Sequence, residues 1–265
     1  MKFTVLGSFE VSGDDNICTP SAPKVRKVLA LMVLRARQVV SIETMIQELW
    51  EDDPPRSAVT TAQTYIYQLR QIFDQLQAAE GMRGSIITRP PGYLLNIADA
   101  QIDASRFTTL LENGRALLNR DTEAAAGTLR EALSLWNGPM LSNVTCGPVL
   151  CGYVAYYQER YTNALELRIA ADMKLGRHHE LIPELKSLVA AQYPLNEWLH
   201  AQLIVSLAKN GRRADALRAY QEVRRLLNVE LGVEPSIDLQ QIQMGLLRSP
   251  DGSSLEVESL LRAAM

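Results

Sequence analysis

The order of secondary-structure signals along the first third of the chain limits the possible folds more than any other feature of this sequence. Two short segments near the start, Lys2–Leu6 and Phe9–Val11, are rich in β-forming residues and predict a small strand pair. From Pro23 onward, apolar residues recur at helical spacing, which predicts a first helix that ends near Arg37. Gln38–Val40 is then expected to be a short extended link.

Two further helices and a hairpin complete this part of the chain. Ser41 is a suitable N-cap for a second helix, and Glu51–Pro55 is expected to end it as a loop, because prolines break helices and acidic residues favour solvent. A third helix is predicted over Ser57–Leu76. Strands at 85–88 and 93–97 flank a turn with two prolines and a glycine, which predicts a hairpin. Strands, three helices and a hairpin in this order form the layout of a winged helix-turn-helix domain, in which the hairpin is the wing.

The third helix is expected to have one buried face and one polar face. At 100° per residue, four apolar side chains fall on one narrow stripe: Ala62, Ile66, Leu69 and Phe73. The opposite face carries six uncharged side chains that can hydrogen-bond: Thr60, Thr61, Thr64, Tyr67, Gln68 and Gln71. Such a face suits the edges of DNA bases, because glutamine can bond adenine through two atoms and a threonine methyl can pack on a thymine methyl. The alternative is an ordinary solvated face, although such faces usually carry more Lys and Glu.

Few basic side chains accompany this polar face. Arg70 lies toward the flank of the apolar stripe, where we expect a DNA phosphate rather than a base as its target. Arg89 is the charged residue at the hairpin tip, and a rigid tip with one arginine suits a narrow minor groove. The alternative is a surface turn with an incidental arginine. Lys24, Arg26 and Lys27 begin the first helix and could contact phosphate, but simple solvation is the favoured interpretation.

After Asp99 almost the whole chain has a helical pattern. The expected helices are 103–119, 122–136, 149–174, 179–191, 197–209, 213–229 and 236–247. One spacing occurs twice: Gly176, Leu181, Leu185 and Leu188 match Gly211, Ala216, Tyr220 and Val223, 35 residues later. A helix-turn-helix unit of about 34 residues is typical of tetratricopeptide repeats, which stack into solenoids. The alternative is ordinary helical-hairpin packing. In the tail, Ser253 and Glu256 could form a capping box for a last short helix.

Composition and motifs argue against several other classes of protein. The formal net charge is −3, and residues 1–97 carry ten basic and ten acidic side chains, so any DNA contact must depend on the placement of a few groups. The sequence contains no GxxxxGK[ST] phosphate loop, HExxH motif or GxSxG elbow, and we therefore expect no enzyme, no cofactor and no metal site. With no export signal and no apolar run long enough to span a bilayer, the protein is expected in the cytoplasm, without membrane contact.

The three cysteines do not suggest a disulfide framework or a zinc site, because their number is odd and none is near a histidine: Cys18, Cys146 and Cys151. We interpret them as structural thiols. A redox pair of Cys146 and Cys151 is the alternative.

Two groups of sequence strings carry a resemblance to known families. Residues 1–97 resemble the DNA-binding domain of OmpR-type response regulators, through Thr64–Arg70 (TYIYQLR), Thr88-Arg89 and Gly92-Tyr93. Residues 98–248 resemble the bacterial transcriptional activator domain, through Glu131–Pro139 (EALSLWNGP), Ala214–Tyr220 (ADALRAY) and Glu230–Ser236 (ELGVEPS). In this order and length, the two domains resemble a small, two-domain member of the Streptomyces antibiotic regulatory protein family.

The resemblance implies a mostly α-helical protein with three parts. These are an α+β winged helix-turn-helix domain at residues 1–97, an all-α, tetratricopeptide-like activator domain at 98–248, and a tail at 249–265. Members of the family activate secondary-metabolite genes. They bind direct repeats near the −35 element as side-by-side protomers and engage RNA polymerase, including the sigma factor. No receiver domain precedes residue 1, so control by aspartate phosphorylation is not expected.

The resemblance also assigns site residues. It implies base contacts at Gln63, Thr64, Tyr67 and Gln68, contacts to the DNA backbone at Trp50, Thr60, Tyr65 and Arg70, and a minor-groove contact at Arg89. Helical spacing places Gln63 and Tyr65 nearer the flank of the polar face. The acidic loop Glu51, Asp52 and Asp53 lies where relatives contact polymerase; its alternative is a solvated loop that caps the preceding helix. The competing function is that of a helical adaptor for protein–protein interaction.

Overall fold

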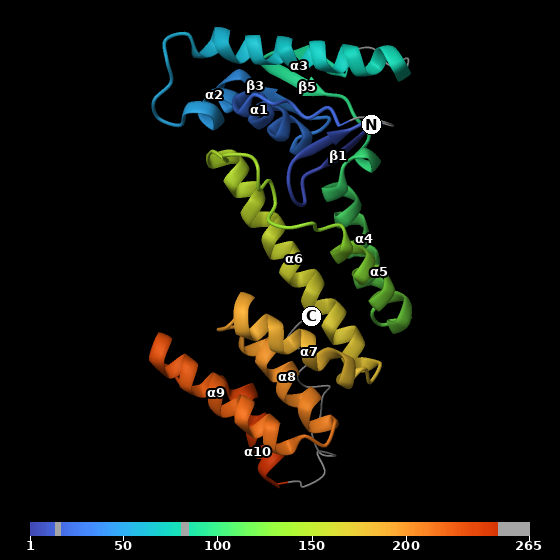
Figure 1. Ribbon diagram of the computed structural model, residues 1–265, viewed down its shortest axis with the longest axis vertical. Helices are drawn as coiled ribbons and strands as arrows, with labels where there is room; N and C mark the ends of the chain where they lie inside the picture. The colour runs from blue at the N-terminus through green and yellow to red at the C-terminus, as the bar shows by residue number, and fades with distance from the viewer. Residues whose placement is uncertain (14–16, 81–84, 249–265) are drawn as a thin grey trace. The chain divides into compact units, whose positions relative to one another are not determined.

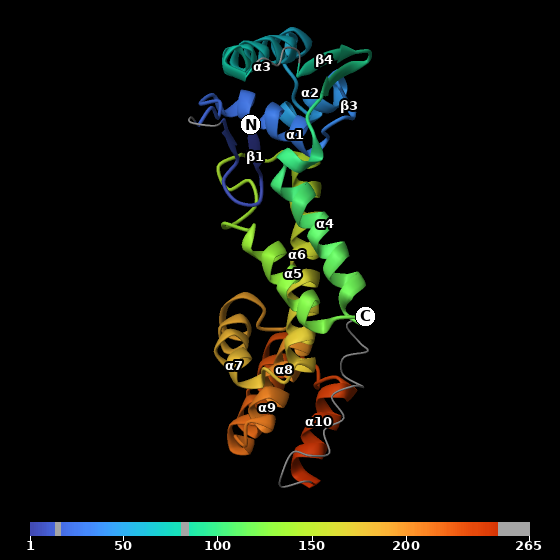
Figure 2. The same ribbon diagram turned by 90° about the vertical axis from the view of Figure 1, so that its right-hand side faces the viewer.

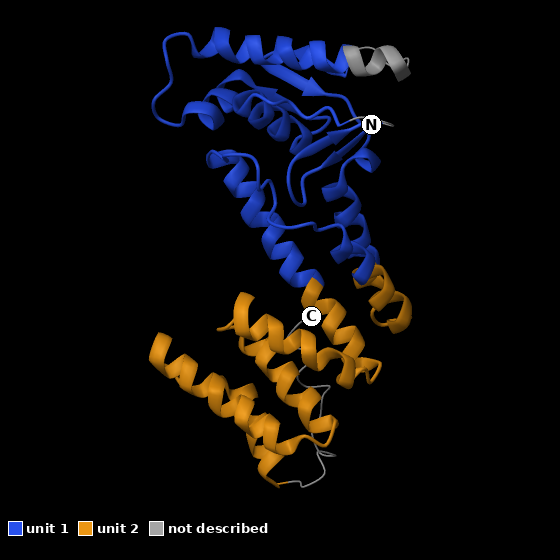
Figure 3. Cartoon of the chain, in the orientation of Figure 1, with its two compact units in different colours: residues 1–113, 130–164 blue, residues 114–129, 165–265 orange. Residues whose placement is uncertain are grey.

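The computed structural model describes residues 1–13, 17–80 and 85–248, and for residues 75–80 only the backbone. The chain divides into two compact units, drawn in different colours in Figure 3. Unit 1 contains residues 1–113 and 130–164, and unit 2 contains residues 114–129 and the chain from 165 onward. The domain boundary expected after residue 97 stays a prediction. The capping box at Ser253 and Glu256 lies outside the described residues.

The N-terminal strand pair in unit 1 is shorter than its sequence pattern. Strands β1 (Lys2–Thr4) and β2 (Glu10–Ser12) pair antiparallel, with Phe3 opposite Val11. The prediction that the first strand continues to Leu6 is wrong for a physical reason. The amides of Val5 and Leu6 donate to the carboxylate of Asp103 at 2.9–3.0 Å instead of to a neighbouring strand.

Three helices and a three-stranded sheet follow, and they confirm the winged helix-turn-helix layout (Figures 1 and 2). The helices are α1 (Pro23–Leu34), α2 (Ile42–Trp50) and α3 (Ala58–Glu80). The strands are β3 (Val39–Ser41), β4 (Ile86–Arg89) and β5 (Gly92–Leu95), in the order β3-β5-β4 and all antiparallel. The hydroxyl of Ser41 accepts from the amide of Thr44, so the expected N-cap of α2 is confirmed.

The end of α1 differs from its prediction. The helix stops at Leu34 instead of near Arg37, because Arg37 takes a left-handed conformation with φ of 63° and its amide donates to the carbonyl of Leu95. This turn sends the chain into β3, so the segment expected to be a simple extended link is a strand paired with β5. β3 crosses so close to Gly92 that a Cβ there would lie 1.9 Å from the carbonyl oxygen of Val40, which explains the glycine.

The activator part of the sequence begins with a 3₁₀ turn, η1 (Asp99–Gln101), followed by α4 (Asp103–Leu117), α5 (Thr122–Ser134) and α6 (Pro148–Lys174). The boundary between the two units falls within each of these three α-helices. In unit 1, Trp136 packs between Phe107 and Tyr161, with ring centroids 5.7 and 4.9 Å away.

Burial raises the pKa of Asp103, although bonds from backbone amides act in the opposite direction.

A buried carboxylate joins α2 to the start of α6 within unit 1. Glu48 is only 1% exposed, and its two oxygens accept from the amides of Gly147 (2.5 Å), Val149 (2.9 Å) and Leu150 (3.0 Å). These amides belong to the residue before α6 and to its first turn, where unpaired donors and the helix dipole favour a negative charge. Gly147 is required here, because a Cβ would lie 2.2 Å from the carbonyl oxygen of Glu48. We call this group of bonds the Glu48 clasp.

Unit 2 continues with four helices. They are α7 (His178–Ser187), which runs on as a π-helical segment η2 (Leu188–Gln192), then α8 (Glu197–Lys209), α9 (Arg213–Leu231) and α10 (Ile237–Arg248). The repeated spacing corresponds to equivalent places in two helical hairpins. Gly176 and Gly211 both have a φ near +70° where one helix ends before the next, and the six apolar positions after them are all buried.

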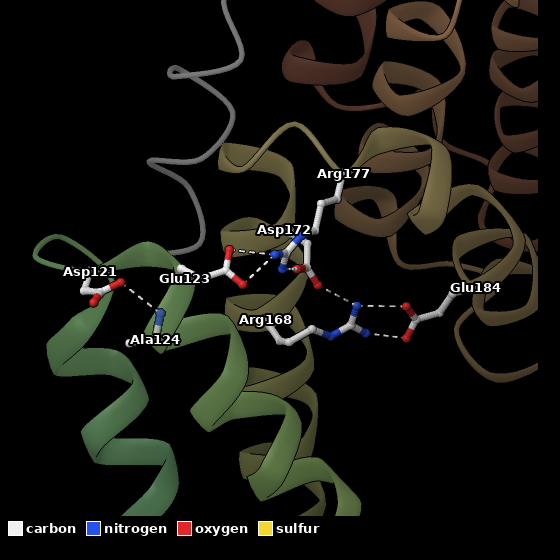
Figure 4. A network of polar contacts seen from close by, with 7 residues as sticks. All are labelled: Asp121, Glu123, Ala124, Arg168, Asp172, Arg177 and Glu184. Carbon is white, nitrogen blue, oxygen red and sulfur yellow. Dashed lines mark hydrogen bonds and ion pairs between the residues drawn. The ribbon is translucent and has the colours of Figure 1, made fainter.

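Charged side chains bridge three helices of unit 2 (Figure 4). Arg168 and Asp172, both almost fully buried on α6, bond each other at 3.3 Å, and Arg168 also pairs with Glu184 of α7. Arg177 donates to Asp172 at 2.9 Å and to both oxygens of Glu123 on α5 at 2.6 Å. The bonds to Glu123 and Asp172 raise the pKa of Arg177. Each buried charge therefore has a partner, which is the condition for its burial.

The Glu48 clasp yields a stability prediction. We expect Glu48→Ala to lower the free energy of unfolding by about 3 kcal/mol, because three backbone donors lose their acceptor. Urea denaturation would measure the change. Glu43→Ala is the control, since Glu43 is an exposed acid on the same helix and its loss should change stability by less than about 1 kcal/mol. Equal effects of the two substitutions would contradict the importance of the clasp.

Candidate nucleic-acid interface

The two faces of α3 are as different as the sequence predicts. The four residues of the apolar stripe, Ala62, Ile66, Leu69 and Phe73, are each at most 2% exposed. They pack toward α1 and α2, and the ring of Phe73 lies 6.3 Å from that of Phe3. Val59 and Asp74 are exposed near the flanks of this stripe. The other exposed residues among the described side chains of α3 are six uncharged groups that can hydrogen-bond: Thr60, Gln63, Thr64, Tyr67, Gln68 and Gln71. We call these six residues the polar face of α3.

The polar face differs slightly from the expected set. Gln63, placed near the flank by helical spacing, is exposed, whereas Thr61 and Tyr65 are half-buried. Tyr67 is the one aromatic side chain of the polar face, and 62% of its surface is exposed. The hydroxyl of Thr64 donates to the carbonyl of Thr60 at 2.9 Å. Its oxygen can therefore still accept a hydrogen bond from a ligand, and its methyl remains for apolar contact.

Arg70 has a structural role that the sequence pattern did not reveal. Its Nε and Nη2 donate to the carbonyl oxygen of Ile86 at 3.3 and 3.2 Å, and Nη2 also donates to the hydroxyl of Thr88 at 2.8 Å. The guanidinium lies 5.5 Å from the ring centre of Tyr93. Arg70 thus joins α3 to both strands of the wing. Nη1 takes part in none of these bonds, so its donors remain on the same side chain.

The wing places one arginine next to a short, constrained turn. Arg89, the last residue of β4, pairs with Gly92 of β5, so the turn between them consists of Pro90 and Pro91 alone. Arg89 and both prolines are exposed. The structure therefore presents Arg89 at the hairpin tip, in the position that the sequence predicts.

The end of α2 presents an aromatic ring and an acidic loop. Trp50 is half-buried, and the ammonium group of Lys24 lies 4.9 Å above its ring. Glu51 then takes a left-handed conformation with φ of 54°, and its amide caps the helix through the carbonyl of Gln47. Glu51, Asp52 and Asp53 are all exposed. The loop therefore caps α2 through its backbone and leaves its three carboxylates facing solvent.

The basic residues of α1 contact other groups of unit 1. The sequence favours simple solvation as their interpretation, with contact to phosphate as the alternative. Arg26 donates to the carbonyl oxygens of Pro20, Ser21 and Asn143, and Lys27 donates to that of Glu48 at 3.2 Å. Together with the Lys24–Trp50 contact, these bonds give all three side chains partners within unit 1.

Metal-binding clusters and membrane-spanning helices are absent from the part of the chain that the structure describes. No group of three or more His, Cys, Asp or Glu side chains is arranged there to hold a metal ion. No helix among those residues is both long and apolar enough to cross a bilayer. All three cysteines are described, and no disulfide links any of them.

Comparison with known proteins identifies both parts of the chain. Residues 102–247 match the model of the bacterial transcriptional activator domain, and residues 19–95 match that of the C-terminal domain of transcriptional regulatory proteins. The regulatory protein DnrI of Streptomyces peucetius is 38% identical over 256 residues, covering 95% of this chain and 94% of DnrI. The chain belongs to the Streptomyces antibiotic regulatory protein family.

Two further relatives of this transcriptional regulator support the assignment. The transcriptional regulator RedD of Streptomyces coelicolor is 33% identical over 241 residues, which is 91% of this chain and 69% of RedD. A solved structure of EmbR from Mycobacterium tuberculosis, in complex with a low-affinity phosphopeptide, superposes with a TM-score of 0.86. It is 29% identical in sequence, and the match covers 99% of this chain and 68% of EmbR. The chain therefore has the two-domain architecture of the family.

The structure also gives roles to residues for which the sequence resemblance predicted none of this kind: Glu48, and Arg70 in its contacts with the wing. Glu48 has one possible signal in the sequence, because it follows Met45 by three positions and precedes Leu49, on the buried side of a short helix. For the wing contacts of Arg70, no local spacing gives a signal, since its partners are 16 and 18 residues away.

The bonds of Arg70 predict a specific effect on the wing. Arg70→Lys keeps the charge but removes the forked geometry that reaches Ile86 and Thr88 together. We expect faster amide hydrogen exchange in residues 86–95 and a loss of about 1 kcal/mol in the free energy of unfolding. Gln71→Lys, an exposed position on the same helix, is the matched control. Unchanged exchange in the wing of the Arg70 variant would show that these bonds do not hold it.

Proposed function

We propose that this regulator binds double-stranded DNA by placing α3 in a major groove. The observation that carries the proposal is the contrast between the faces of α3: its apolar stripe is buried, and the six side chains of its polar face are exposed, uncharged and able to hydrogen-bond. Side chains of this kind can read base edges, which present a distinct pattern of donors and acceptors for each base pair. The base contacts are assigned to Gln63, Thr64, Tyr67 and Gln68, all of which are exposed.

The DNA backbone is contacted by residues at the margins of this face. We assign these contacts to Trp50, Thr60, Tyr65 and Arg70, which are exposed or half-buried around α3. For Arg70 the role is combined with its bonds to the wing, and Nη1 is the atom free of those bonds that can reach a phosphate. Arg89 enters a minor groove, where a narrow width concentrates negative potential around a single arginine.

A single protomer is expected to bind weakly, and this supports assembly on repeated sites. Residues 1–97 carry no net charge, so the attraction that gives most DNA-binding proteins their non-specific affinity is small here. Two protomers on adjacent direct repeats would gain from multivalency without new base contacts. We therefore propose side-by-side binding to direct repeats near a −35 element. Selection of bound DNA from a random pool tests this, and recovery of only single sites would contradict it.

Activation is assigned to the acidic loop at the end of α2. Glu51, Asp52 and Asp53 are exposed, follow directly after Trp50, and carry three negative charges that DNA would repel. Their natural partner is a basic protein surface, and we propose RNA polymerase, including its sigma factor, as that partner. The controlled genes are proposed to be those of a secondary-metabolite pathway, in keeping with the family.

A second function is favoured by one observation in unit 2. A groove of about 560 Å³ runs between α7, α8 and α9, and helical repeats often bind peptides in such grooves. The chain could therefore act as an adaptor for another protein. The two functions are separated by a titration with promoter-like DNA, for which an adaptor would show only weak affinity that does not depend on sequence.

The base-reading role of α3 predicts a change at one position of the bound DNA. Gln68→Ala should reduce the preference at a single base pair by about 1–3 kcal/mol and leave the other positions unchanged. Arg89→Ala should instead weaken binding generally and reduce the preference for A·T-rich minor grooves. Selection from a random DNA pool would measure both, with Gln47→Ala on the exposed side of α2 as a control. If the Gln68 variant selects the same sequences as the natural protein, this residue does not read bases.

The role of the acidic loop predicts that activation and DNA binding can be separated. The double substitution Asp52→Lys and Asp53→Lys should preserve DNA affinity, or raise it slightly through added positive charge, yet reduce transcription in vitro with purified polymerase. The pair Glu43→Lys and Glu159→Lys makes the same charge change at other exposed sites of unit 1 and should leave transcription near its normal level. Normal activation by the loop variant would contradict the proposed contact.

A further inference from the structure

A small cavity in unit 2 lies between α8 and the start of α10. Its volume is about 180 Å³, and two of the residues that line it, Ser236 and Asp238, are exposed, so it opens to solvent there. Ala201 of α8 and Leu239 of α10, both buried, give it an apolar lining, and the half-buried Trp198 adds an aromatic one. The cavity therefore suits a small molecule with an apolar or aromatic body.

One polar side chain of this cavity is buried without a hydrogen-bond partner. Gln202 is only 1% exposed, and neither Nε2 nor Oε1 of its amide group has a partner among the residues that the structure describes. The buried Nε1 of Trp198, one turn earlier on α8, also lacks one within the described chain. Buried polar groups are nearly always hydrogen-bonded, because burial otherwise costs them their hydration. A molecule in the cavity that offers an acceptor next to a donor would meet this requirement.

The charge at the mouth of the cavity is negative. Asp238 is exposed and makes no ion pair with any described residue. One carboxylate oxygen of Glu197 accepts from the amide of Ser236 at 2.6 Å, and Glu197 makes no ion pair within the described chain either. Lysine and arginine are absent from the described residues that line the cavity. The mouth therefore favours an occupant with a positive charge at the end that faces solvent.

We propose that this cavity binds a small aromatic amide that carries a positive charge. The amide group of the ligand would pair with that of Gln202, with its carbonyl accepting from Nε2 and its N–H donating to Oε1. Its ring would pack on Trp198 and Leu239, and its cationic group would lie near Asp238. The proposal concerns unit 2 alone and does not depend on DNA binding. It gives the helical part of this regulator a site for a small molecule.

The size of the cavity is sufficient for such a ligand. A closed cavity of about 150 Å³ can hold benzene. The cavity beside Gln202 is slightly larger and open at one end, so it has room for a ring with its amide group inside and its charged group at the mouth. 4-(Aminomethyl)benzamide has these three parts and serves as the probe.

An NMR titration of the full chain tests the proposal. The chain has three tryptophans, so ¹⁵N labelling gives three indole signals, and Trp198→Phe identifies that of Trp198. The probe should shift this signal with a Kd of about 1 mM, a modest affinity for so small a ligand, and leave the signals of Trp50 and Trp136 in place. 4-Methylbenzamide, which lacks the charge, should bind about fivefold more weakly. 4-Methylbenzylamine, which lacks the amide, should bind about tenfold more weakly than the probe.

Two variants separate the polar contacts of the ligand. Gln202→Leu should weaken binding of the probe about tenfold, because the amide of the ligand then faces an apolar group. Asp238→Asn should weaken it about fivefold, yet leave the affinity for 4-methylbenzamide unchanged. Gln221→Leu and Glu230→Gln make the same changes at exposed sites of α9 outside the cavity, and neither should alter these affinities.

Urea denaturation would check that the variants fold. Gln202→Leu should be at least as stable as the natural protein, because it removes a buried amide without a partner, and the Asp238→Asn test concerns an exposed residue and does not depend on it. Three results would each overturn the proposal: no selective shift of the Trp198 signal, unchanged affinity of Gln202→Leu for the probe, or equal affinities for the probe and 4-methylbenzylamine.

Discussion

The Glu48 clasp is the interaction on which the arrangement of unit 1 depends. A carboxylate that is 1% exposed loses its hydration, and three amides and the positive end of a helix dipole must compensate for that loss. The compensation requires α2 and the first turn of α6 to meet in one geometry. Because α2 packs against α3 and ends in Trp50 and the acidic loop, the clasp fixes the helix that supports the proposed DNA face to the start of an activator helix.

Polar side chains from beyond residue 100 complete the N-terminal strand region. Asp103 accepts from the amides of Val5 and Leu6, and the amide group of Asn143 bonds both the N–H and the carbonyl of Phe9. Buried backbone groups require such partners, and these side chains supply them where the strand ladder ends. The N-terminal strands are therefore part of a core that residues 98–113 and 130–164 help to build. This explains why unit 1 includes segments from both of the domains that the sequence resemblance defines.

Features that depend on neighbouring residues could be predicted from the sequence, whereas those that depend on residues far along the chain could not. The burial of Ala62, Ile66, Leu69 and Phe73, and the exposure of the opposite face, could be predicted because helical periodicity is a local property. The role of Glu48 could not, because its partners lie about 100 residues away and a glutamate usually indicates solvent. The predicted end of α1 is wrong because it, too, depends on a distant contact: the amide of Arg37 bonds the carbonyl of Leu95 in the sheet. Which residues contact DNA stays a prediction.

The charge balance of residues 1–97 bears on how a regulator of this kind can be selective for particular DNA sites. Lys24, Arg26 and Lys27 are committed to contacts within the protein, and Arg70 is largely committed to the wing. If only about three cations remain for phosphate, raising salt from 50 to 200 mM costs one protomer about fortyfold in affinity, far less than for strongly basic binders. In the proposed mode of binding, most of the discrimination would then come from base contacts of α3, and most of the affinity from the number of protomers on adjacent sites. A neutral domain with an uncharged reading face is thus suited to recognise repeated sites and to leave isolated ones largely unoccupied.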